Sequence, residues 1–136
     1  MKLAALQSDI VWEQPEANFA RLSLRIARTA ADGAQLIVLP EMFACGFSMQ
    51  TANVAEDYDG PTAAFLMEQA RTHQVWICGT VPERARGGSD PRPSNTLVLA
   101  APDGNSWRYH KLHPFTFGGE HQHYAAGRDG LTVEIH

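Results

Sequence analysis

The chain has 136 residues, of which 44% are hydrophobic and 19% charged, a composition typical of one globular domain rather than of a disordered, fibrous or membrane-spanning protein. Its net charge of −4 and its scattered basic residues argue against a nucleic-acid partner. No apolar run is long enough to span a membrane, so we expect no membrane partner. The opening MKLAALQSD lacks the pattern of a secretory signal, and the two cysteines lack a CxxC spacing, so we expect reduced thiols and a cytoplasmic protein.

The first forty residues predict a strand, a helix and a second strand. Residues 2–7 form a short apolar segment, which predicts a strand. Residues 15–32 then repeat apolar side chains at helical spacing, and Pro15 suits the first turn of a helix. Gly33 suits the end of that helix. The continuous apolar run at 36–39 indicates a strand that is buried on both faces.

A second helix and a hairpin are predicted downstream. The helix begins at Pro61 after a polar loop, and residues 75–81 form another buried strand. A loop at 82–94 follows, rich in glycine, proline and arginine. Residues 95–100 and 106–110 flank a strong turn sequence, so we expect them to pair as a hairpin.

Residues 131–136 alternate apolar and polar side chains, which predicts a half-buried strand. About six strands with two helices leave much of a sheet uncovered, whereas mixed sheets normally bury both faces. We therefore expect that a C-terminal half is missing.

Glu41 is the first candidate for a functional side chain. It follows an apolar strand and a proline in the segment LIVLPEMF, and loops at strand ends commonly present functional groups. A carboxylate at the mouth of an apolar strand is partly desolvated and suited to act as a general base. A solvated loop acid is the alternative, and composition does not decide between the two.

Lys111 lies at the exit of the predicted hairpin, in the segment YHKLHPFTFGGEHQHY at 109–124. A lysine held near a carboxylate can stabilise the anion of a tetrahedral intermediate, whereas an ordinary surface lysine would have no such role. Phe115, Phe117 and two glycines indicate a tight turn from which Glu120 emerges. This segment suits either a pocket wall or a cap over the core.

The histidine-rich loop at 110–123 also suggests a metal-binding protein. His121 and His123 would share one face of a strand, and Glu120 or His113 could add ligands. A zinc or iron site usually needs three well-spaced ligands with supporting partners, which the remaining histidines do not supply. We therefore expect no metal and no cofactor, and keep metal binding as an alternative.

Neither cysteine is expected to be a nucleophile. Cys78 lies in the apolar run VWICGTV and is expected in the core. Cys45 lies four residues after Glu41 in the loop ACGF and is the less certain of the two, but nothing near it in the sequence identifies a base at attacking distance.

Three ordered segments, LPEMFACGFSM at 39–49, YHKLHPF at 109–115 and GGEHQHYAAG at 118–127, resemble the nitrilase or carbon-nitrogen hydrolase superfamily, and within it the omega-amidases. The resemblance implies an α/β fold, a nitrilase-like four-layer α-β-β-α sandwich of which this chain is the N-terminal half. Residues 1–136 would then be the N-terminal part of a single carbon-nitrogen hydrolase domain, truncated before the catalytic cysteine.

That family uses a glutamate, a lysine and a cysteine, and the resemblance assigns the first two to Glu41 and Lys111. It implies that Glu41 takes the thiol proton, that the thiolate attacks an amide carbonyl and that Lys111 stabilises the oxyanion. Glu120 matches an additional acidic position and would orient Lys111 or the leaving group and assist the hydrolytic water. Phe43 and Phe117 would line the substrate pocket. Neither cysteine matches the position of the family's nucleophile, so this chain is expected to lack it.

The activity implied is cysteine-dependent hydrolysis of a small non-peptide amide, which releases ammonia from ω-amides of dicarboxylic or α-keto acids through an acyl-enzyme. The complete protein would form a homodimer and act on a small-molecule amide. The alternatives are the metal-binding protein described above and a catalytically inactive fragment or subunit that docks through its open sheet.

Overall fold

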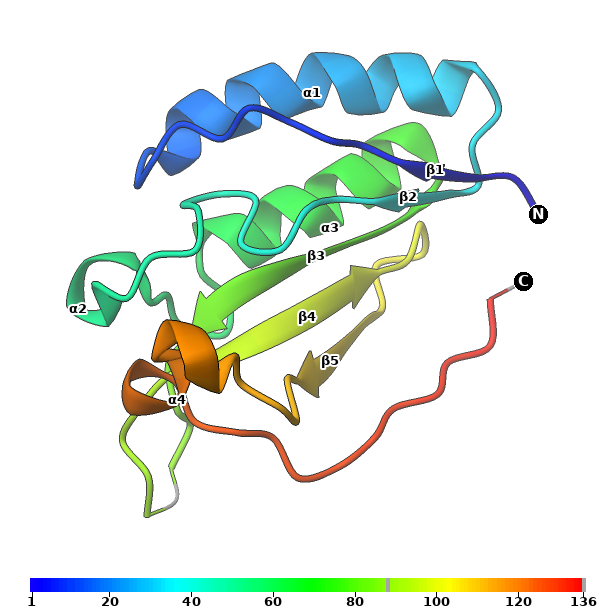
Figure 1. Ribbon diagram of the computed structural model, residues 1–136. Coiled ribbons are helices and arrows are strands. Elements are labelled where there is room, and N and C mark those ends of the chain that lie inside the picture. The colour runs from blue at the N-terminus through cyan, green and yellow to red at the C-terminus, as the bar shows by residue number, and fades with distance from the viewer. Residues whose placement is uncertain (88, 136) are drawn as a thin grey trace.

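Residues 1–87 and 89–135, which the computed structural model describes, build one five-stranded mixed sheet (Figure 1). The strands follow one another across the sheet in chain order as β1 (Leu3–Ala5), β2 (Leu36–Val38), β3 (Trp76–Glu83), β4 (Ser94–Ala100) and β5 (Ser106–His110). β1, β2 and β3 are parallel, whereas β4 pairs antiparallel with both β3 and β5. The predicted hairpin is therefore confirmed.

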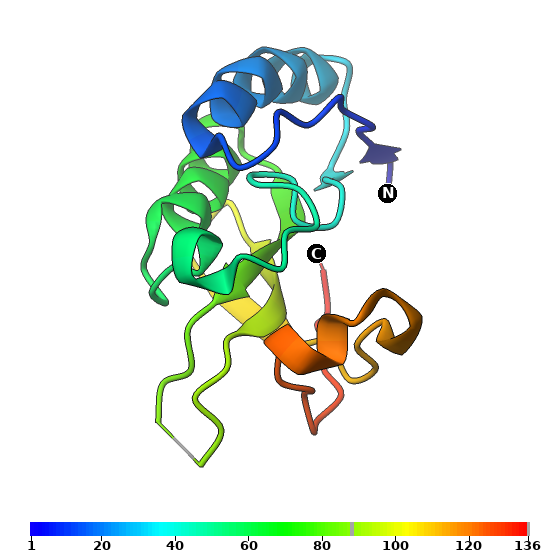
Figure 2. The same ribbon diagram turned by 60° about the vertical axis from the view of Figure 1, so that its left-hand side comes forward.

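Two long helices, α1 (Pro15–Ala31) and α3 (Pro61–His73), connect the parallel strands. Each begins with a proline, which suits a first helical turn, and Gly33 follows α1 with a φ of 88°. Parallel strands joined in sequence by right-handed crossovers place successive helices on the same side of a sheet. Both helices accordingly cover one face, as Figures 1 and 2 show.

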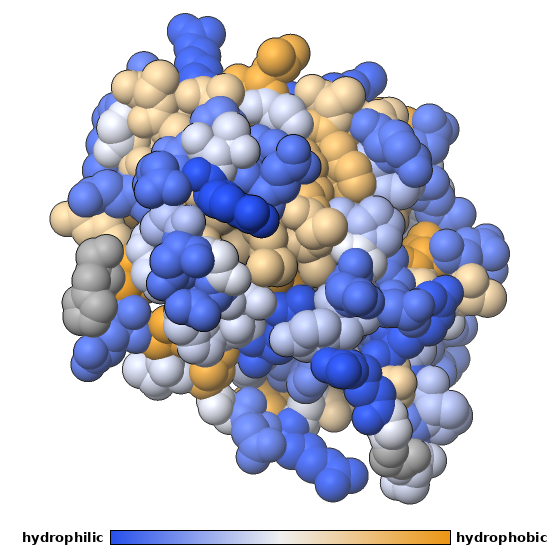
Figure 3. All heavy atoms as spheres, turned by 180° about the vertical axis from the view of Figure 1, so that it is seen from behind, coloured by the Kyte–Doolittle hydropathy of each residue, from blue (hydrophilic) through white to orange (hydrophobic). Residues whose placement is uncertain are grey.

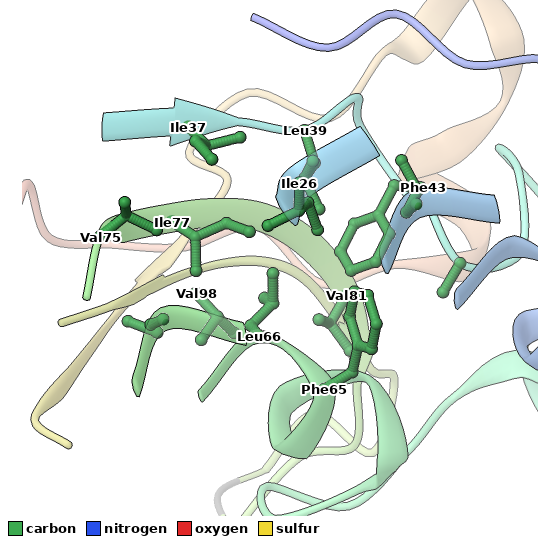
Figure 4. Packing of buried hydrophobic residues seen from close by; sticks show 14 of the residues in the cluster. Ile26, Ile37, Leu39, Phe43, Phe65, Leu66, Val75, Ile77, Val81 and Val98 are labelled. Atoms are coloured by element: carbon green, nitrogen blue, oxygen red, sulfur yellow. The ribbon is translucent and has the colours of Figure 1, made fainter. Parts of the chain in front are cut away.

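The hydrophobic core lies between these helices and the sheet (Figure 4). Leu22 and Ile26 from α1, Leu66 from α3, and Ile77 and Val98 from the sheet are almost completely buried. Burial of one such side chain stabilises the fold by about 1.5–3 kcal/mol. The helical periodicity and the apolar strands seen in the sequence therefore meet in one core.

The opposite face of the sheet is covered by neither long helix. Trp76 and Trp107 stack there with ring centroids 5.5 Å apart, and Leu36, Val38 and Leu97 are partly buried. Side chains alternate along a strand, so residues between core positions point to this face. This uncovered apolar face is what the ratio of helices to strands predicts.

Two segments expected to be irregular or extended contain short helices. The polar loop before α3 includes α2 (Thr51–Val54), and the segment after β5 forms a 3-10 turn (Thr116–Gly118) and α4 (Glu120–His123). The glycine before α4 adopts a φ of 77°, which reverses the chain and starts the helix.

The strand predicted at 131–136 is wrong for residues 131–135, and residue 136 lies outside the described residues. A strand requires a neighbour for its backbone hydrogen bonds. In this part of the chain, the bridge between Ser94 and Ala125 and the bond from the Gly127 N–H to the Lys111 carbonyl are followed by no further ladder. Residues 128–132 are consequently exposed.

Hydrophilic residues gather at the lower right of the back of the molecule (Figure 3), where the loop between β3 and β4 lies. This loop includes Arg84, Arg86 and Arg92.

Within the described residues, no helix combines the length and the apolar character needed to cross a bilayer.

Candidate active site

Glu41 lies in the turn that follows β2, at the end of the parallel strands. The Leu39 N–H still donates to the Cys78 carbonyl on β3 (2.8 Å). Met42 then turns with a φ of 48° and donates its N–H to Oγ1 of Thr80 (2.7 Å). The backbone is thus anchored on both sides of Glu41, whose side chain is 48% exposed.

Lys111 directly follows β5, and its backbone is held from both sides. Its N–H donates to the Asn95 carbonyl on β4 (2.9 Å), and its carbonyl accepts the Gly127 N–H (2.8 Å). A Cβ at Gly127 would lie 2.1 Å from the His110 carbonyl oxygen, so this approach requires glycine. These contacts fix the direction in which the Lys111 side chain leaves the sheet.

Glu120 begins α4 and is fully buried. Its Oε2 accepts the backbone N–H of Phe115, and its Oε1 accepts an N–H of Asn95 Nδ2 at 2.9 Å. The turn before α4 therefore carries a carboxylate into the protein and supplies a donor to one of its oxygens, while Asn95 on β4 supplies a donor to the other.

These three side chains meet at the Lys111 ammonium group. Lys111 Nζ lies 2.7 Å from Glu41 Oε1 and 2.9 Å from Glu120 Oε2. Asn95 Nδ2 donates to the same Glu41 oxygen at 2.6 Å. The structure therefore brings together the three residues assigned to chemistry from the sequence, in a cluster of two carboxylates, one ammonium group and one amide.

The cluster keeps Lys111 and Glu120 ionised. Partial burial by itself would lower the pKa of Lys111, but hydrogen bonds and opposite charges from Glu41 and Glu120 outweigh it and raise this pKa above its usual value. Burial would raise the pKa of Glu120, but the Phe115 N–H, Asn95 and Lys111 outweigh it and hold this pKa below its usual value. Lys111 and Glu120 are therefore both charged at neutral pH.

A pocket of about 580 Å³ opens beside the cluster. Glu41 and Lys111 form part of its wall, together with Phe47, His113 and the residues 114–116. The ammonium group of Lys111 also lies 5.3 Å from the centre of the Phe47 ring, within the range of a cation–π contact. The polar groups thus border a space that has both aromatic and polar walls.

The expectation that Phe43 lines this pocket is corrected by the structure. Its ring is fully buried in the core, where Figure 4 shows it beside Phe65. It is tilted against Phe19 and Phe65, with ring centroids 6.4 and 6.1 Å away. Gly79 makes room for it, since a Cβ there would lie 2.6 Å from the ring. The turn after β2 directs Phe43 between sheet and helices while its neighbour Glu41 points elsewhere.

Phe117 is also not part of the pocket wall. Its side chain is 95% exposed, and its ring lies against that of Phe115 with centroids 6.0 Å apart. The 3-10 turn rotates Phe117 outward because successive residues of a helical turn point in different directions. Phe47 and Phe115 take the aromatic positions in the pocket instead.

Phe43 and Phe117 consequently offer a matched test by substitution. We expect Phe43→Ala to lower the free energy of unfolding by about 3–5 kcal/mol, because it leaves a cavity in the core. Phe117→Ala should change it by no more than about 0.5 kcal/mol. Urea unfolding of both variants measures the difference, and similar losses in the two would contradict these placements.

The histidines of the loop do not form the geometry that a metal site was expected to use. His121 and His123 lie in α4 rather than on a strand, so positions two apart point to different sides. In the part of the chain that the structure describes, no three or more His, Cys, Asp or Glu side chains are grouped to hold a metal ion.

Both cysteines are buried and free. Burial, followed by the charges of Glu56 and Glu13, raises the pKa of the Cys45 thiol to about 12, and burial raises the pKa of Cys78. A thiol in either environment is a poor source of thiolate near pH 7. Cys45 also lines a different pocket, beside Glu13 and Glu56, rather than the one beside Lys111.

Asn95 is the member of the cluster that sequence reasoning missed. It was assigned to a strand without any further role. Asparagine is disfavoured in strands, so its presence at the start of the apolar run NTLVLA is the signal that was available.

A mixed α/β sheet that holds a carboxylate, an ammonium group and a second, buried carboxylate in contact at a pocket has the components of an acid–base catalyst. The chain belongs to the carbon-nitrogen hydrolase family, whose family model matches residues 2–131.

Relatives of known name agree with this membership. The chain is 33% identical to omega-amidase YafV of Yersinia enterocolitica over 134 residues, which cover 98% of this chain and 50% of that protein. It is 30% identical to the 2-oxoglutaramate amidase of Bacillus subtilis, over 98% of this chain and 51% of that protein. The chain thus spans about half the length of these curated relatives.

Solved structures agree on the fold. XC1258 from Xanthomonas campestris, a CN-hydrolase superfamily protein with an arsenic adduct in its active site, matches with a TM-score of 0.86 and 39% identity, over 95% of this chain and 47% of that one. An amidase from Nesterenkonia sp. matches at 23% identity with a TM-score of 0.76, over 95% and 49% of the two chains. The predicted nitrilase-like α/β fold is therefore confirmed, and this chain forms one mixed sheet with two long helices on one face.

Proposed function

We propose that this chain is part of a cysteine-dependent amidase that hydrolyses a small non-peptide amide and releases ammonia. The observation that supports this most is the contact of Lys111 Nζ with Glu41 Oε1 (2.7 Å) and Glu120 Oε2 (2.9 Å) at the edge of a pocket. Membership of the carbon-nitrogen hydrolase family and relatives named as amidases support the same chemistry.

In the proposed reaction, Glu41 accepts the proton of a thiol, and the thiolate attacks the amide carbonyl carbon. The carbonyl π electrons move onto oxygen, and the Lys111 ammonium group stabilises the resulting anion. As the intermediate collapses, the carbon–nitrogen bond breaks, protonated Glu41 returns its proton to nitrogen, and ammonia leaves. Water then hydrolyses the thioester and regenerates the thiol.

Glu120 has a supporting role in this proposal. It is buried and already accepts hydrogen bonds from Asn95, Lys111 and Phe115, so its oxygens are occupied. Such a group orients the Lys111 ammonium towards the reacting carbonyl and balances its charge. In this proposal it acts on the leaving group and on the hydrolytic water only through Lys111, which borders the pocket.

The thiol comes, in this proposal, from a part of the protein outside residues 1–136. Cys45 and Cys78 are buried with raised pKa values, and Cys45 lines another pocket. Residues 1–136 are then the N-terminal part of a single domain, and the 136-residue chain alone is inactive.

The proposed substrates are ω-amides of dicarboxylic or α-keto acids. Relatives named omega-amidase and 2-oxoglutaramate amidase support this class. We further propose a cytoplasmic homodimer as the complete enzyme.

The test is ammonia release by the full-length protein with ω-amides of four- and five-carbon dicarboxylic acids. We expect ammonia and an acyl-enzyme whose added mass equals that of the acyl group less the hydrogen it replaces on sulfur, detected by mass spectrometry of the intact protein. The 136-residue chain should give neither. Full-length protein that releases no ammonia from any of these amides would contradict the proposal and favour an inactive subunit.

A further inference from the structure

We propose that Asn95 is a positioning residue of this site, whose amide group holds Glu41 and Glu120 in place and leaves Glu41 Oε2 as the oxygen that accepts a proton. This role deepens the proposed amidase function and rests on it for its effect on turnover. The geometry can be tested without turnover.

Asn95 touches all three ionisable members of the cluster. It is 2% exposed and lies on β4. Its backbone carbonyl accepts the Lys111 N–H at 2.9 Å, while its Nδ2 donates to Glu41 Oε1 at 2.6 Å and to Glu120 Oε1 at 2.9 Å. A single strand residue therefore joins groups that come from three separate segments.

The orientation of the Asn95 amide follows from its neighbours. If nitrogen and oxygen were exchanged, the amide oxygen would face two carboxylate oxygens without a proton between them. In the orientation observed, both N–H groups are used, whereas the buried Oδ1 accepts no hydrogen bond from any described residue. The site therefore uses both N–H donors of Asn95, while its amide oxygen accepts no hydrogen bond from the described residues.

The two carboxylate oxygens of Glu41 differ in their hydrogen bonds. Oε1 accepts from both Asn95 and Lys111. Among the described residues, Oε2 accepts no hydrogen bond, and the half-exposed Glu41 side chain borders the pocket. Oε2 is thus the oxygen free to take a proton from a group that enters the pocket.

Asn95 also stabilises the ionised state of Glu120. Two carboxylates and one ammonium group carry a net charge of −1, and like charges favour uptake of a proton. The other titratable groups nearby are His113 on the pocket wall and Tyr124, which the charge of Glu120 affects. The N–H that Asn95 donates to Glu120 lowers the pKa of this carboxyl group without adding charge, so its loss should let Glu120 take up a proton at higher pH.

The experiment compares Asn95→Leu and Asn95→Asp in the full-length protein. Leucine removes both donors, whereas aspartate keeps the shape and replaces the donors by a third carboxylate. We expect kcat to fall about 10²-fold with little change in KM, because the base is displaced rather than the binding pocket altered. The pH at which activity falls to half on the acid side should rise in both variants.

A second readout needs no activity. The carboxyl carbon resonance of Glu120, assigned with Glu120→Gln, should titrate at a higher pH in both Asn95 variants than in the wild type, because one of the hydrogen bonds that lower this pKa is gone. If the wild-type protein releases no ammonia, the amidase proposal fails, and this titration alone decides the role of Asn95.

Thr96→Val provides the matched control. Thr96 is the next residue of β4, is fully buried, and pairs with His110 Nδ1 (2.8 Å) on the other face of the sheet. This variant also removes the hydrogen bonds of a β4 side chain, to His110 Nδ1 and to the Ser94 carbonyl, but should leave both the pH profile and the Glu120 titration unchanged. Unchanged pH behaviour in the Asn95 variants, or an equal change in Thr96→Val, would overturn the proposal.

Discussion

Replacing Glu41 by glutamine in the full-length protein is expected to lower kcat for ammonia release by about 10²–10⁴-fold, the usual contribution of a general base. Glutamine has nearly the same shape, and its carbonyl oxygen can still accept the hydrogen bonds that Asn95 and Lys111 donate to Glu41. It cannot take up the thiol proton. KM and the thermal unfolding midpoint should therefore change little. Steady-state kinetics with a coupled ammonia assay measures the effect.

Glu68→Gln is the control for this substitution. Glu68 is an exposed residue of α3, so its loss removes the same charge from the chain without touching the pocket. We expect wild-type turnover from this variant. Turnover of Glu41→Gln at the level of this control would rule out Glu41 as the base.

Lys111→Ala is expected to lower kcat by about 10²–10³-fold, as is typical for the loss of one group that stabilises an oxyanion. It should also destabilise the fold, because Glu120 is fully buried and would lose the opposite charge 2.9 Å away. Asn95 and the Phe115 N–H still bind Glu120, so we expect a loss of about 1–3 kcal/mol rather than unfolding. Chemical denaturation at pH 7, combined with the ammonia assay, measures both effects.

The difference in stability between wild type and Lys111→Ala should depend on pH in a defined direction. The pKa of Glu120 is lowered from 4.5, so its contribution is present above that value and lost as pH falls through the folded-state pKa. The pKa of Lys111 is raised from 10.5, so its contribution is present below that value and lost as pH rises through the folded-state pKa. We therefore expect the largest difference near neutral pH. A difference that does not vary with pH would contradict a charge-based contact.

Lys2→Ala is the matched control, because Lys2 is the other of the chain's two lysines and lies near the exposed N-terminus. Its Nζ donates to the carbonyl of Asp32, which is remote from Glu120 in the fold. We expect this variant to keep wild-type turnover and stability.

Most of the secondary structure follows from short-range patterns. Helical spacing between Pro15 and Gly33, and the prolines that begin both long helices, predicted α1 and α3. The turn between 100 and 106 predicted the β4–β5 hairpin. The predicted strand at 131–135 was wrong because alternation shows that a segment could pair, but pairing needs a neighbouring strand.

For the functional site, the sequence identified the charged residues but misplaced the aromatic ones. Glu41, Lys111 and Glu120 were selected from the sequence, partly through family resemblance, and their side chains do meet. Phe43 and Phe117 were assigned to the pocket through the family resemblance, and each lies close to one of these residues in the chain. Neighbours in sequence point in different directions at a turn, so Phe43 entered the core and Phe117 the solvent.

The sequence by itself determined the first strand–helix–strand unit, the start of both long helices and the identities of the charged residues, because periodicity, turn chemistry and short motifs act over a few residues. Its resemblance to a known family gave the class of fold. The tertiary structure alone decided that Asn95 joins the two carboxylates, that Glu120 is buried, and that Phe47 rather than Phe43 borders the pocket. These facts depend on how β2, β4 and α4 are placed relative to one another. Such placement results from the packing of the whole chain and leaves no periodic trace at the residues concerned.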